Sequence, residues 1–166
     1  MKYTIISGSN RKDSASEKVA VVYQKVLEEK GIPAEVLTMV DLEVWHRSES
    51  FLQVEKSLLI PTTHFIFIIP EYNGTFPGVL KAMIDNTDIS KVWYHKKALL
   101  TGVSSGRAGN LRGIDHLAAS LNYLKVHVHY NKLPISQIEK VMDSDGQLNS
   151  ETLKVIEEQI EEFIHF

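Results

Sequence analysis

The feature that most constrains the fold of this chain is the apolar run Phe65-Ile66-Phe67-Ile68-Ile69, in which polar and apolar residues do not alternate. A strand of this kind is typical of a parallel sheet that helices cover on both faces. Similar runs, rich in β-branched and aromatic residues, recur along the chain. They predict five strands, over residues 3–7, 34–37, 65–69, 98–103 and 124–130.

Between these runs, apolar residues recur at helical spacing. The first such stretch should begin near Ser14, which forms a capping-box pattern with Glu17, and should stop at Gly31. Further helices are predicted over residues 79–84, 111–121 and 153–164. Since strands and helices alternate, residues 1–166 should form one domain. We expect a three-layer, doubly wound α/β fold whose five parallel strands follow the order 2-1-3-4-5.

That strand order predicts where a ligand should bind. Parallel strands with right-handed crossovers end along one edge of the sheet, and the crevice opens where the strand order reverses. In this order the reversal lies between the first and third strands. The loops over residues 8–13 and 70–76 should therefore line the site.

Composition limits the partners. The chain has 18 Lys and Arg against 21 Asp and Glu, a net charge of −3, and no basic run, so neither nucleic acid nor a membrane surface is expected. Its first residues enter a strand pattern at once, and no apolar stretch is long enough for a membrane span, so we expect a cytoplasmic protein. The absence of cysteine means that redox chemistry would belong to a bound cofactor.

A pair of histidines marks the last predicted strand. His127 and His129 alternate with valines and should share one strand face. No third ligand stands at suitable spacing, so we expect no metal site. A polar strand face or a subunit contact explains the pair more simply.

The first loop, residues 8–16, joins the first strand to a helix N-terminus. Unpaired backbone N–H groups and the helix dipole favour an anion there, and a phosphate fits. The alternative is a polar turn in which Ser14 only caps the helix. The loop contains neither G-x-G-x-x-G nor G-x-x-x-x-G-K-[ST], so it indicates no dinucleotide fold and no nucleoside triphosphatase. Its candidate binding residues are Ser9, Asn10, Arg11, Ser14 and Ser16, with Lys12 adding charge.

The second loop, residues 70–77, follows the third strand, and its two prolines and one glycine restrict its path. The ring of Tyr72 could border a flat heteroaromatic ring, whose polar edge the Asn73 amide and backbone amides could bind. An ordinary turn before a helix that begins at Pro77 is the alternative. For Glu71 we expect capping, or pairing with an arginine, rather than a functional role. The candidate binding residues are Pro70, Glu71, Tyr72, Asn73 and Gly74.

The third loop, residues 103–110, follows the fourth strand and opens the next helix. Its glycines and serines offer N–H groups that could stabilise negative charge on a reduced ring or an oxyanion. A flexible Gly/Ser loop is the alternative. The candidate binding residues are Ser104, Ser105, Gly106 and Arg107.

Together the three loops resemble the NADPH-dependent FMN reductase family, the flavodoxin-like group that includes flavin, quinone and azo-dye reductases. Residues 8–16 resemble its G-S-x-R-x-x-S phosphate loop, and residues 70–85 resemble its P-E-Y-N-x-x-x-P-x-x-L-K-x-x-I-D run. The third loop is similar to S-x-G-x-x-G-G-x-R, with Asn110 in place of the second glycine. Ala82 and Asn86 depart from the asparagine and tryptophan common at those positions.

The resemblance implies FMN as cofactor, with its phosphate held by Ser9, Arg11 and Ser16. Residues 70–74 would line the ring and the ribityl chain, residues 104–106 would close the far side, and Arg107 could stabilise the reduced flavin. NADPH or NADH would reduce the flavin in a ping-pong cycle, and a quinone, azo compound or free flavin would then accept the electrons. No side chain need act as acid or base. The family tendency is a homodimer or homotetramer.

Two other functions fit the topology. A flavodoxin-type carrier would transfer electrons without nicotinamide turnover, but carriers typically show a T-x-T-G-x-T-like loop and a strongly acidic surface. A phosphoacceptor signalling domain needs an acidic pair after the first strand and an aspartate after the third. Residues 7–9 and Pro70-Glu71 stand at those places instead. The reductase is therefore the leading prediction.

Overall fold

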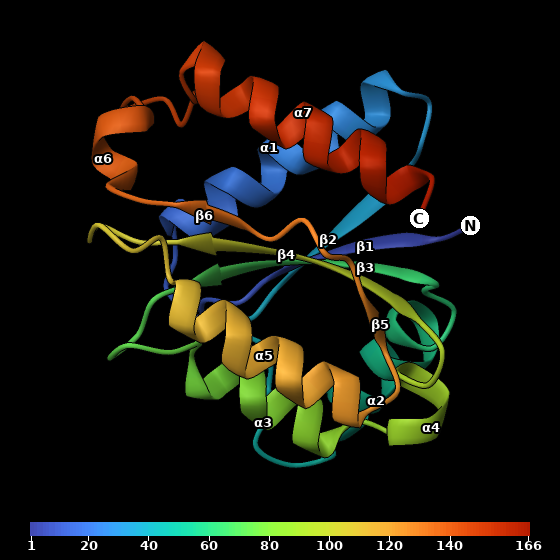
Figure 1. Cartoon of the computed structure of the whole chain (residues 1–166). Helices are drawn as coiled ribbons and strands as arrows, with labels where there is room; N and C mark the ends of the chain where they lie inside the picture. Colours follow the sequence, from blue (N-terminus) through green and yellow to red (C-terminus); the bar gives the residue numbers. More distant parts are fainter.

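The computed structural model describes residues 1–166 as three layers, with one sheet between two layers of helices (Figure 1). The strands are β1 Tyr3–Ser7, β2 Ala34–Thr38, β3 His64–Pro70, β4 Lys97–Val103, β5 His127–Val128 and β6 Leu133–Ile135. The helices are α1 Ala15–Glu29, α2 Glu49–Val54, α3 Gly78–Asn86, α4 Ile89–Val92, α5 Leu111–Tyr123, α6 Ile138–Val141 and α7 Ser150–Ile164, and a π-helix, η1, covers Glu55–Leu59. None of the helices has the length and apolar character that a membrane crossing needs.

The sheet is parallel and has the order β2-β1-β3-β4-β5, which confirms the predicted doubly wound topology. β1 lies between β2 and β3, with Tyr3 paired to Ala34 on one side and to His64 on the other. The carboxyl ends of the central strands point to the left in Figure 1, where the loops after β1, β3 and β4 gather.

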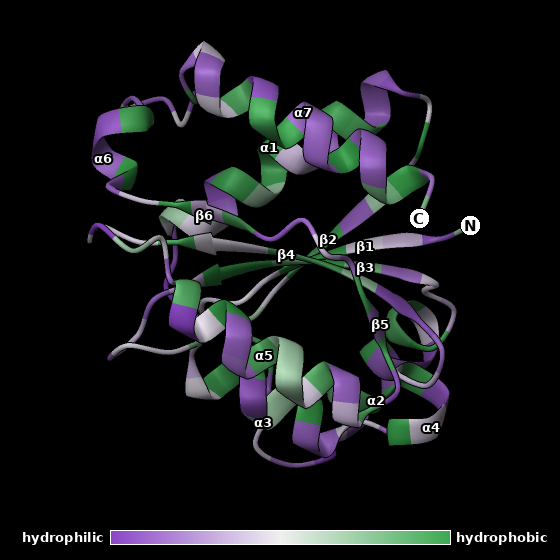
Figure 2. Cartoon of the chain, in the orientation of Figure 1, coloured by the Kyte–Doolittle hydropathy of each residue, from purple (hydrophilic) through white to green (hydrophobic).

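Two separate apolar cores explain the unbroken apolar run in β3. Phe65, Phe67 and Ile69 face the layer that contains α3 and α5. Ile66 and Ile68 face the opposite layer, with α1 and α7. Figure 2 shows the central strands in green and the outward faces of the helices mostly in purple. The strand is therefore buried on both faces, as its sequence predicts.

The last predicted strand is wrong in its extent. α5 continues to Tyr123, and the strand that follows contains only His127 and Val128. The sheet edge resumes as β6, and the register explains the break: Lys97 pairs with His127, whereas Thr101 pairs with Leu133, so the edge accommodates two extra residues. The sheet thus has six strands, with β5 and β6 both beside β4.

A buried glutamine fills the break between β5 and β6. The Nε2 of Gln159, in α7, donates to the carbonyl of Leu100 at 3.3 Å and to that of Asn131 at 2.9 Å. A side chain therefore takes the place that backbone pairing would occupy in a continuous strand.

The two histidines of this segment have different surroundings. His127 is exposed, and its ring lies 6.4 Å from that of His95. His129 lies outside β5 and is buried, with its ring against those of Phe163 and Phe166. No three His, Cys, Asp or Glu side chains gather in a way that could hold a metal ion.

The first helix begins and ends as the sequence predicts. The Ser14 Oγ accepts the N–H of Glu17 at 3.2 Å, and Gly31 follows the helix at φ +75°.

Later in the chain, Asn86 ends α3, and its Nδ2 donates to the carbonyl of Val44 at 2.9 Å. Asn86 thus anchors the segment after β2 to α3.

Candidate cofactor-binding site

The three loops meet at the carboxyl edge of the sheet and line an open cavity of about 270 Å³. We call it the three-loop cavity. The predicted binding residues that line it are Ser9, Arg11, Ser14, Ser16, Pro70, Glu71, Tyr72, Ser104 and Ser105. Lys12, Ala15, Val103, Ile138 and Glu139 complete the lining.

A direct contact joins the first and second loops across the point where the strand order reverses. The hydroxyls of the buried Ser9 and of Tyr72 lie 2.9 Å apart. The guanidinium carbon of Arg11 lies 4.5 Å from the centre of the Tyr72 ring, and the backbone N–H of Arg11 donates to Ser9 Oγ at 3.1 Å. The two loops are therefore held in a fixed mutual position before any ligand is considered.

The first loop presents donors that have no acceptor within the protein. The backbone N–H groups of Asn10, Lys12 and Asp13 donate to no protein atom. They lie just before α1, so the helix dipole adds to their attraction for an anion. The hydroxyls of Ser14 and Ser16 lie 3.0 Å apart. This arrangement can bind a phosphate.

The start of the first loop is pressed against β3. The N–H of Gly8 donates to the carbonyl of Ile68 at 2.9 Å. A Cβ at Gly8 would lie 3.2 Å from Leu80 Cδ2 and 3.3 Å from the Ile68 oxygen. Glycine permits this close approach. One residue earlier, the buried Oγ of Ser7 has no hydrogen-bond partner in the protein.

The second loop is a tight turn. Tyr72 and Thr75 exchange backbone hydrogen bonds at 2.9 and 3.2 Å. Between them, Asn73 at φ +52° and Gly74 at φ +81° form a turn with two left-handed residues. The Thr75 hydroxyl lies 2.8 Å from His116 Nδ1, so the far side of the turn rests on α5.

Asn110 joins the third loop to the second. It stands at φ +59°, a conformation that glycine and asparagine tolerate best, and it is 1 % exposed. Its Nδ2 donates to the carbonyls of Ile69 and Pro70, both at 3.0 Å. Because a Cβ at Gly113 would lie 2.2 Å from Asn110 Oδ1, the helix beneath needs a glycine at that position.

The structure leaves some predicted residues outside the cavity lining and changes the expectation for one inside it. Asn10, Asn73, Gly74, Gly106 and Arg107 do not line the three-loop cavity, and their role in binding stays a prediction. Glu71 lines the cavity, but its carboxylate makes no hydrogen bond and no ion pair. The expectation that it caps a loop or pairs with an arginine is therefore wrong.

Sequence reasoning missed the wall formed by Ile138 and Glu139. This wall is in place because the chain from Ile135 to Ile138 bonds to the third loop. Ser104 N–H donates to the Ile135 carbonyl and Ile138 N–H donates to the Ser104 carbonyl, both at 3.0 Å. Gln137 N–H donates to the Gly106 carbonyl at 2.9 Å. The predicted edge strand ended at residue 130, whereas the edge continues to Ile135. Recognising Leu133–Ile135 as a strand would have placed the residues that follow it beside the third loop.

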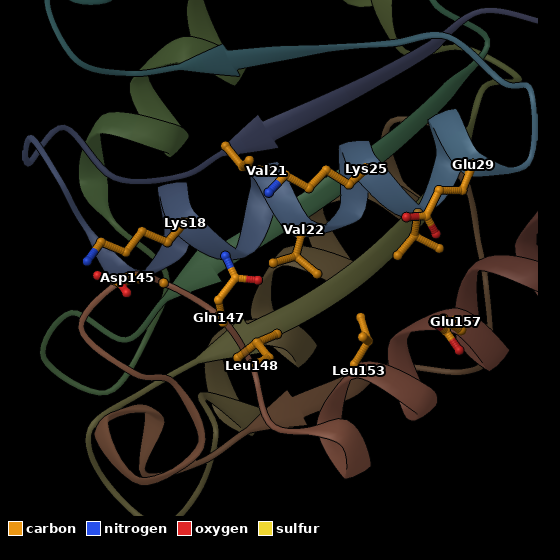
Figure 3. A pocket seen from close by; sticks show the side chains of 12 residues that line it. Lys18, Val21, Val22, Lys25, Glu29, Asp145, Gln147, Leu148, Leu153 and Glu157 are labelled. Atoms are coloured by element: carbon orange, nitrogen blue, oxygen red, sulfur yellow. The ribbon is translucent and has the colours of Figure 1, made fainter.

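A further hollow, of about 260 Å³, lies between α1, α7 and the loop that contains Gln147 (Figure 3). Valines and leucines line its centre, and Lys18, Lys25, Glu29 and Glu157 stand around it. It shares no lining residue with the three-loop cavity.

Comparisons with known proteins show the family of this chain. The family model of NADPH-dependent FMN reductases matches residues 1–140. An NAD(P)H-dependent FMN reductase of Pseudomonas aeruginosa is 32% identical over 100 residues, which are 58% of this chain and 54% of that protein. The match thus spans about half the length of that relative. A probable NADPH:quinone oxidoreductase 2 of Oryza sativa subsp. japonica is 26% identical over 168 residues, covering 93% of this chain and 82% of that protein.

A solved structure shares the fold over nearly the whole chain. FerB, a flavoenzyme NAD(P)H:(acceptor) oxidoreductase from Paracoccus denitrificans, superposes with a TM-score of 0.84 at 24% identity. The superposition covers 99% of this chain and 95% of FerB. Since the family model covers most of the sequence, the chain belongs to the NADPH-dependent FMN reductase family.

Proposed function

We propose that this chain is an FMN-dependent NAD(P)H oxidoreductase that passes reducing equivalents from the dinucleotide, through FMN, to a small-molecule acceptor. The acceptor would be a quinone, an azo compound or free flavin. The observation that carries the proposal is the three-loop cavity, with unpaired N–H groups at the start of α1 and with Tyr72 fixed beside them by Ser9. Family membership and the names of the relatives support it.

The residues present fit FMN. The unpaired N–H groups of the first loop and the uncompensated charge of Arg11 suit a phosphate. Ser7, whose buried hydroxyl has no partner, immediately precedes this loop, and Gly8 lets the backbone approach β3 closely. Ser9, Arg11, Ser14 and Ser16 would hold the phosphate. Pro70 to Tyr72 and Ser104 to Ser105 would line the ribityl chain and the ring.

When bound, FMN supplies the hydride and electron transfer that the side chains of this chain cannot perform. The contribution of the protein is to orient the cofactor and to stabilise negative charge. The three hydrogen bonds between the third loop and residues 135–138 hold the third loop firmly. Preorganised N–H groups there need no rearrangement when charge develops on a bound ring, which is when such donors stabilise most.

Steady-state kinetics of the purified protein with FMN, NADPH or NADH and a benzoquinone acceptor test the proposal. We expect oxidation of the nicotinamide and parallel double-reciprocal plots, because donor and acceptor would use the same open face in turn. A protein that binds flavin but oxidises neither dinucleotide would contradict the reductase proposal and favour the electron-carrier alternative.

We also propose that the chain assembles as a homodimer or homotetramer. A hollow of about 430 Å³ between α3 and α5 is lined by Ile84, Ile89, Tyr123 and Leu124, and Tyr123 is 87 % exposed. Burial of this face against a second copy would remove apolar surface from water. Light scattering should give a multiple of the 18.8 kDa chain mass, and a monomer would contradict the proposal.

We propose that the chain acts in the cytoplasm, where its electron donors NADH and NADPH are available. Cell fractionation with an antibody against the chain tests this, and recovery outside the cytoplasmic fraction would contradict it.

A further inference from the structure

The three-loop cavity continues past the first loop into a second hollow of about 330 Å³. The two linings share Ala15, Ile138 and Glu139. The residues found only in the second hollow are Asp13, Lys18, Met142, Asp143 and Ser144. The shared residues lie beside the start of α1, which is the end of the cavity that suits a phosphate. The second hollow is therefore a route for a ligand longer than FMN, and this route passes Ile138 and Glu139.

Glu139 has a defined position at this junction. It is the second residue of α6, and the chain just before it is bonded to the third loop at Ser104 and Gly106. Its side chain is exposed and makes no hydrogen bond or ion pair, so its charge is uncompensated by any protein group. The carboxylate thus lies at the opening between the two hollows without a partner.

The two sides of this opening differ in charge. On the side of the first loop are the unpaired N–H groups and the cations Arg11 and Lys12, with Glu71 as the one carboxylate besides Glu139. On the other side, the only cation in the lining is Lys18, against the carboxylates of Asp13, Asp143 and Glu139 itself.

The one cation of the second hollow is engaged with the neighbouring loop. Lys18 Nζ lies 3.5 Å from the carbonyl oxygen of Ser144, and Figure 3 shows its side chain extending toward Asp145. Asp143 is also fixed in place, because its Oδ1 accepts the N–H groups of Asp145 at 3.0 Å and of Gln147 at 2.8 Å. The second hollow therefore has room for part of a ligand but repels an anion.

We propose that Glu139 is a specificity residue that makes the site select flavin mononucleotide over flavin adenine dinucleotide; the inference rests on the proposed function. FMN ends at one phosphate, which the first loop compensates. The dinucleotide carries a second phosphate on the same side, and along the route into the second hollow this group would meet the carboxylate of Glu139 and the acidic lining beyond it. The negative charge of Glu139 would repel the second phosphate of the dinucleotide, and it would weaken FMN binding less. The barrier is electrostatic, because the hollow itself is open.

Titration of the flavin-free protein with FMN and with FAD, followed by flavin fluorescence, tests this inference. The measured quantity is the ratio of the FAD Kd to the FMN Kd. We expect a ratio of at least about tenfold for the unaltered chain, which should fall several-fold in Glu139→Gln and further in Glu139→Lys. Added salt should also lower the ratio, since it screens the repulsion. Glu158→Gln, an exposed carboxylate on α7 outside both hollows, is the matched control and should keep the ratio unchanged.

The outcomes separate this inference from the proposed function. If FMN binds but both Glu139 variants keep the ratio of the unaltered chain, the inference is overturned and the proposed function stands. If Glu139→Gln weakens FAD more than FMN, the carboxylate binds the dinucleotide instead, which also overturns the inference. If the unaltered chain binds neither flavin, both fail.

Discussion

At the scale of single residues, Asn110 combines two requirements of the third loop. Its backbone takes the left-handed conformation at φ +59°, and its amide donates to the carbonyls of Ile69 and Pro70. The glycine common at this position in the family would satisfy the first requirement alone. The departure from the family pattern therefore adds a link between two loops of the site.

This link predicts a graded loss of stability. Asn110→Gly should lower the free energy of unfolding by about 1–3 kcal/mol, because two hydrogen bonds are lost. Asn110→Ala should lose about 1 kcal/mol more, because alanine is strained at positive φ. Urea unfolding followed by circular dichroism measures both, with the exposed Asn122→Ala as control. Equal stability of Asn110→Gly and the unaltered chain would contradict the structural role.

Arg11 lies in the same loop as the unpaired N–H groups, and its guanidinium lies over the Tyr72 ring. Arg11→Ala should weaken FMN binding by about 1.5–3 kcal/mol, the range for a hydrogen bond to a charged group. Arg11→Lys should lose less, because it keeps the charge but not the planar contact with the ring. Fluorescence titration checks this, and the exposed Lys154→Ala on α7 should bind FMN like the unaltered chain. Unchanged affinity in Arg11→Ala would assign Arg11 to solvent or to the dinucleotide.

At the scale of elements, α7 is joined to the sheet by a buried polar network. Gln159 bonds to the hydroxyls of Tyr23 and Thr101, which lie 2.7 Å apart, and to the carbonyls of Leu100 and Asn131. Burial raises the pKa of Tyr23, so its hydroxyl stays protonated and able to donate. The network connects α1, β4 and α7 at the place where the edge strand is interrupted.

Removal of the Gln159 amide should lower the stability of the fold. Gln159→Leu leaves the Leu100 and Asn131 carbonyls without this donor, and we expect the free energy of unfolding to fall by about 2–4 kcal/mol. Chemical denaturation measures the loss, with Glu157→Leu on the exposed side of α7 as control. A loss below that of the control variant would show that the network adds no stability.

The same segment shows where sequence reasoning succeeds and fails. β1, β3 and α1 were predictable because apolar periodicity and the Ser14 cap are local signals, and their order gave the sheet topology. The interruption after β5 was not, because it depends on Gln159, about 30 residues further along the chain. Ending the last strand at residue 130 also hid the Ile138–Glu139 wall. In contrast, the meeting of the first and second loops followed from topology, which brings both loops to one edge.

At the scale of the whole molecule, His64 links stability to pH. Burial, then Lys97 and the N-terminal ammonium, lower the pKa of His64 from 6.5 to about 4. The unfolded chain therefore binds a proton between pH 6.5 and 4 that the folded chain does not. The free energy of unfolding is therefore highest above pH 6.5. It falls by at most about 3 kcal/mol as the pH drops from 6.5 through 4.

The substitution His64→Phe tests this linkage, because it keeps an aromatic ring against Tyr3 and Phe163 but cannot take up a proton. The variant should lose less stability than the unaltered chain between pH 6.5 and 4 in urea titrations. Burial also lowers the pKa of His129, so some slope should remain. An identical slope in both proteins would contradict the role of His64.

On the proposed function, the three-loop cavity binds FMN through its phosphate. Titration of the flavin-free chain with FMN and with riboflavin, which lacks the phosphate, tests it most directly. We predict one FMN per chain and riboflavin binding weaker by at least about tenfold, because the unpaired N–H groups of the first loop would have no anion to compensate. Equal affinity for the two flavins, or no binding of FMN, would contradict phosphate recognition by the first loop.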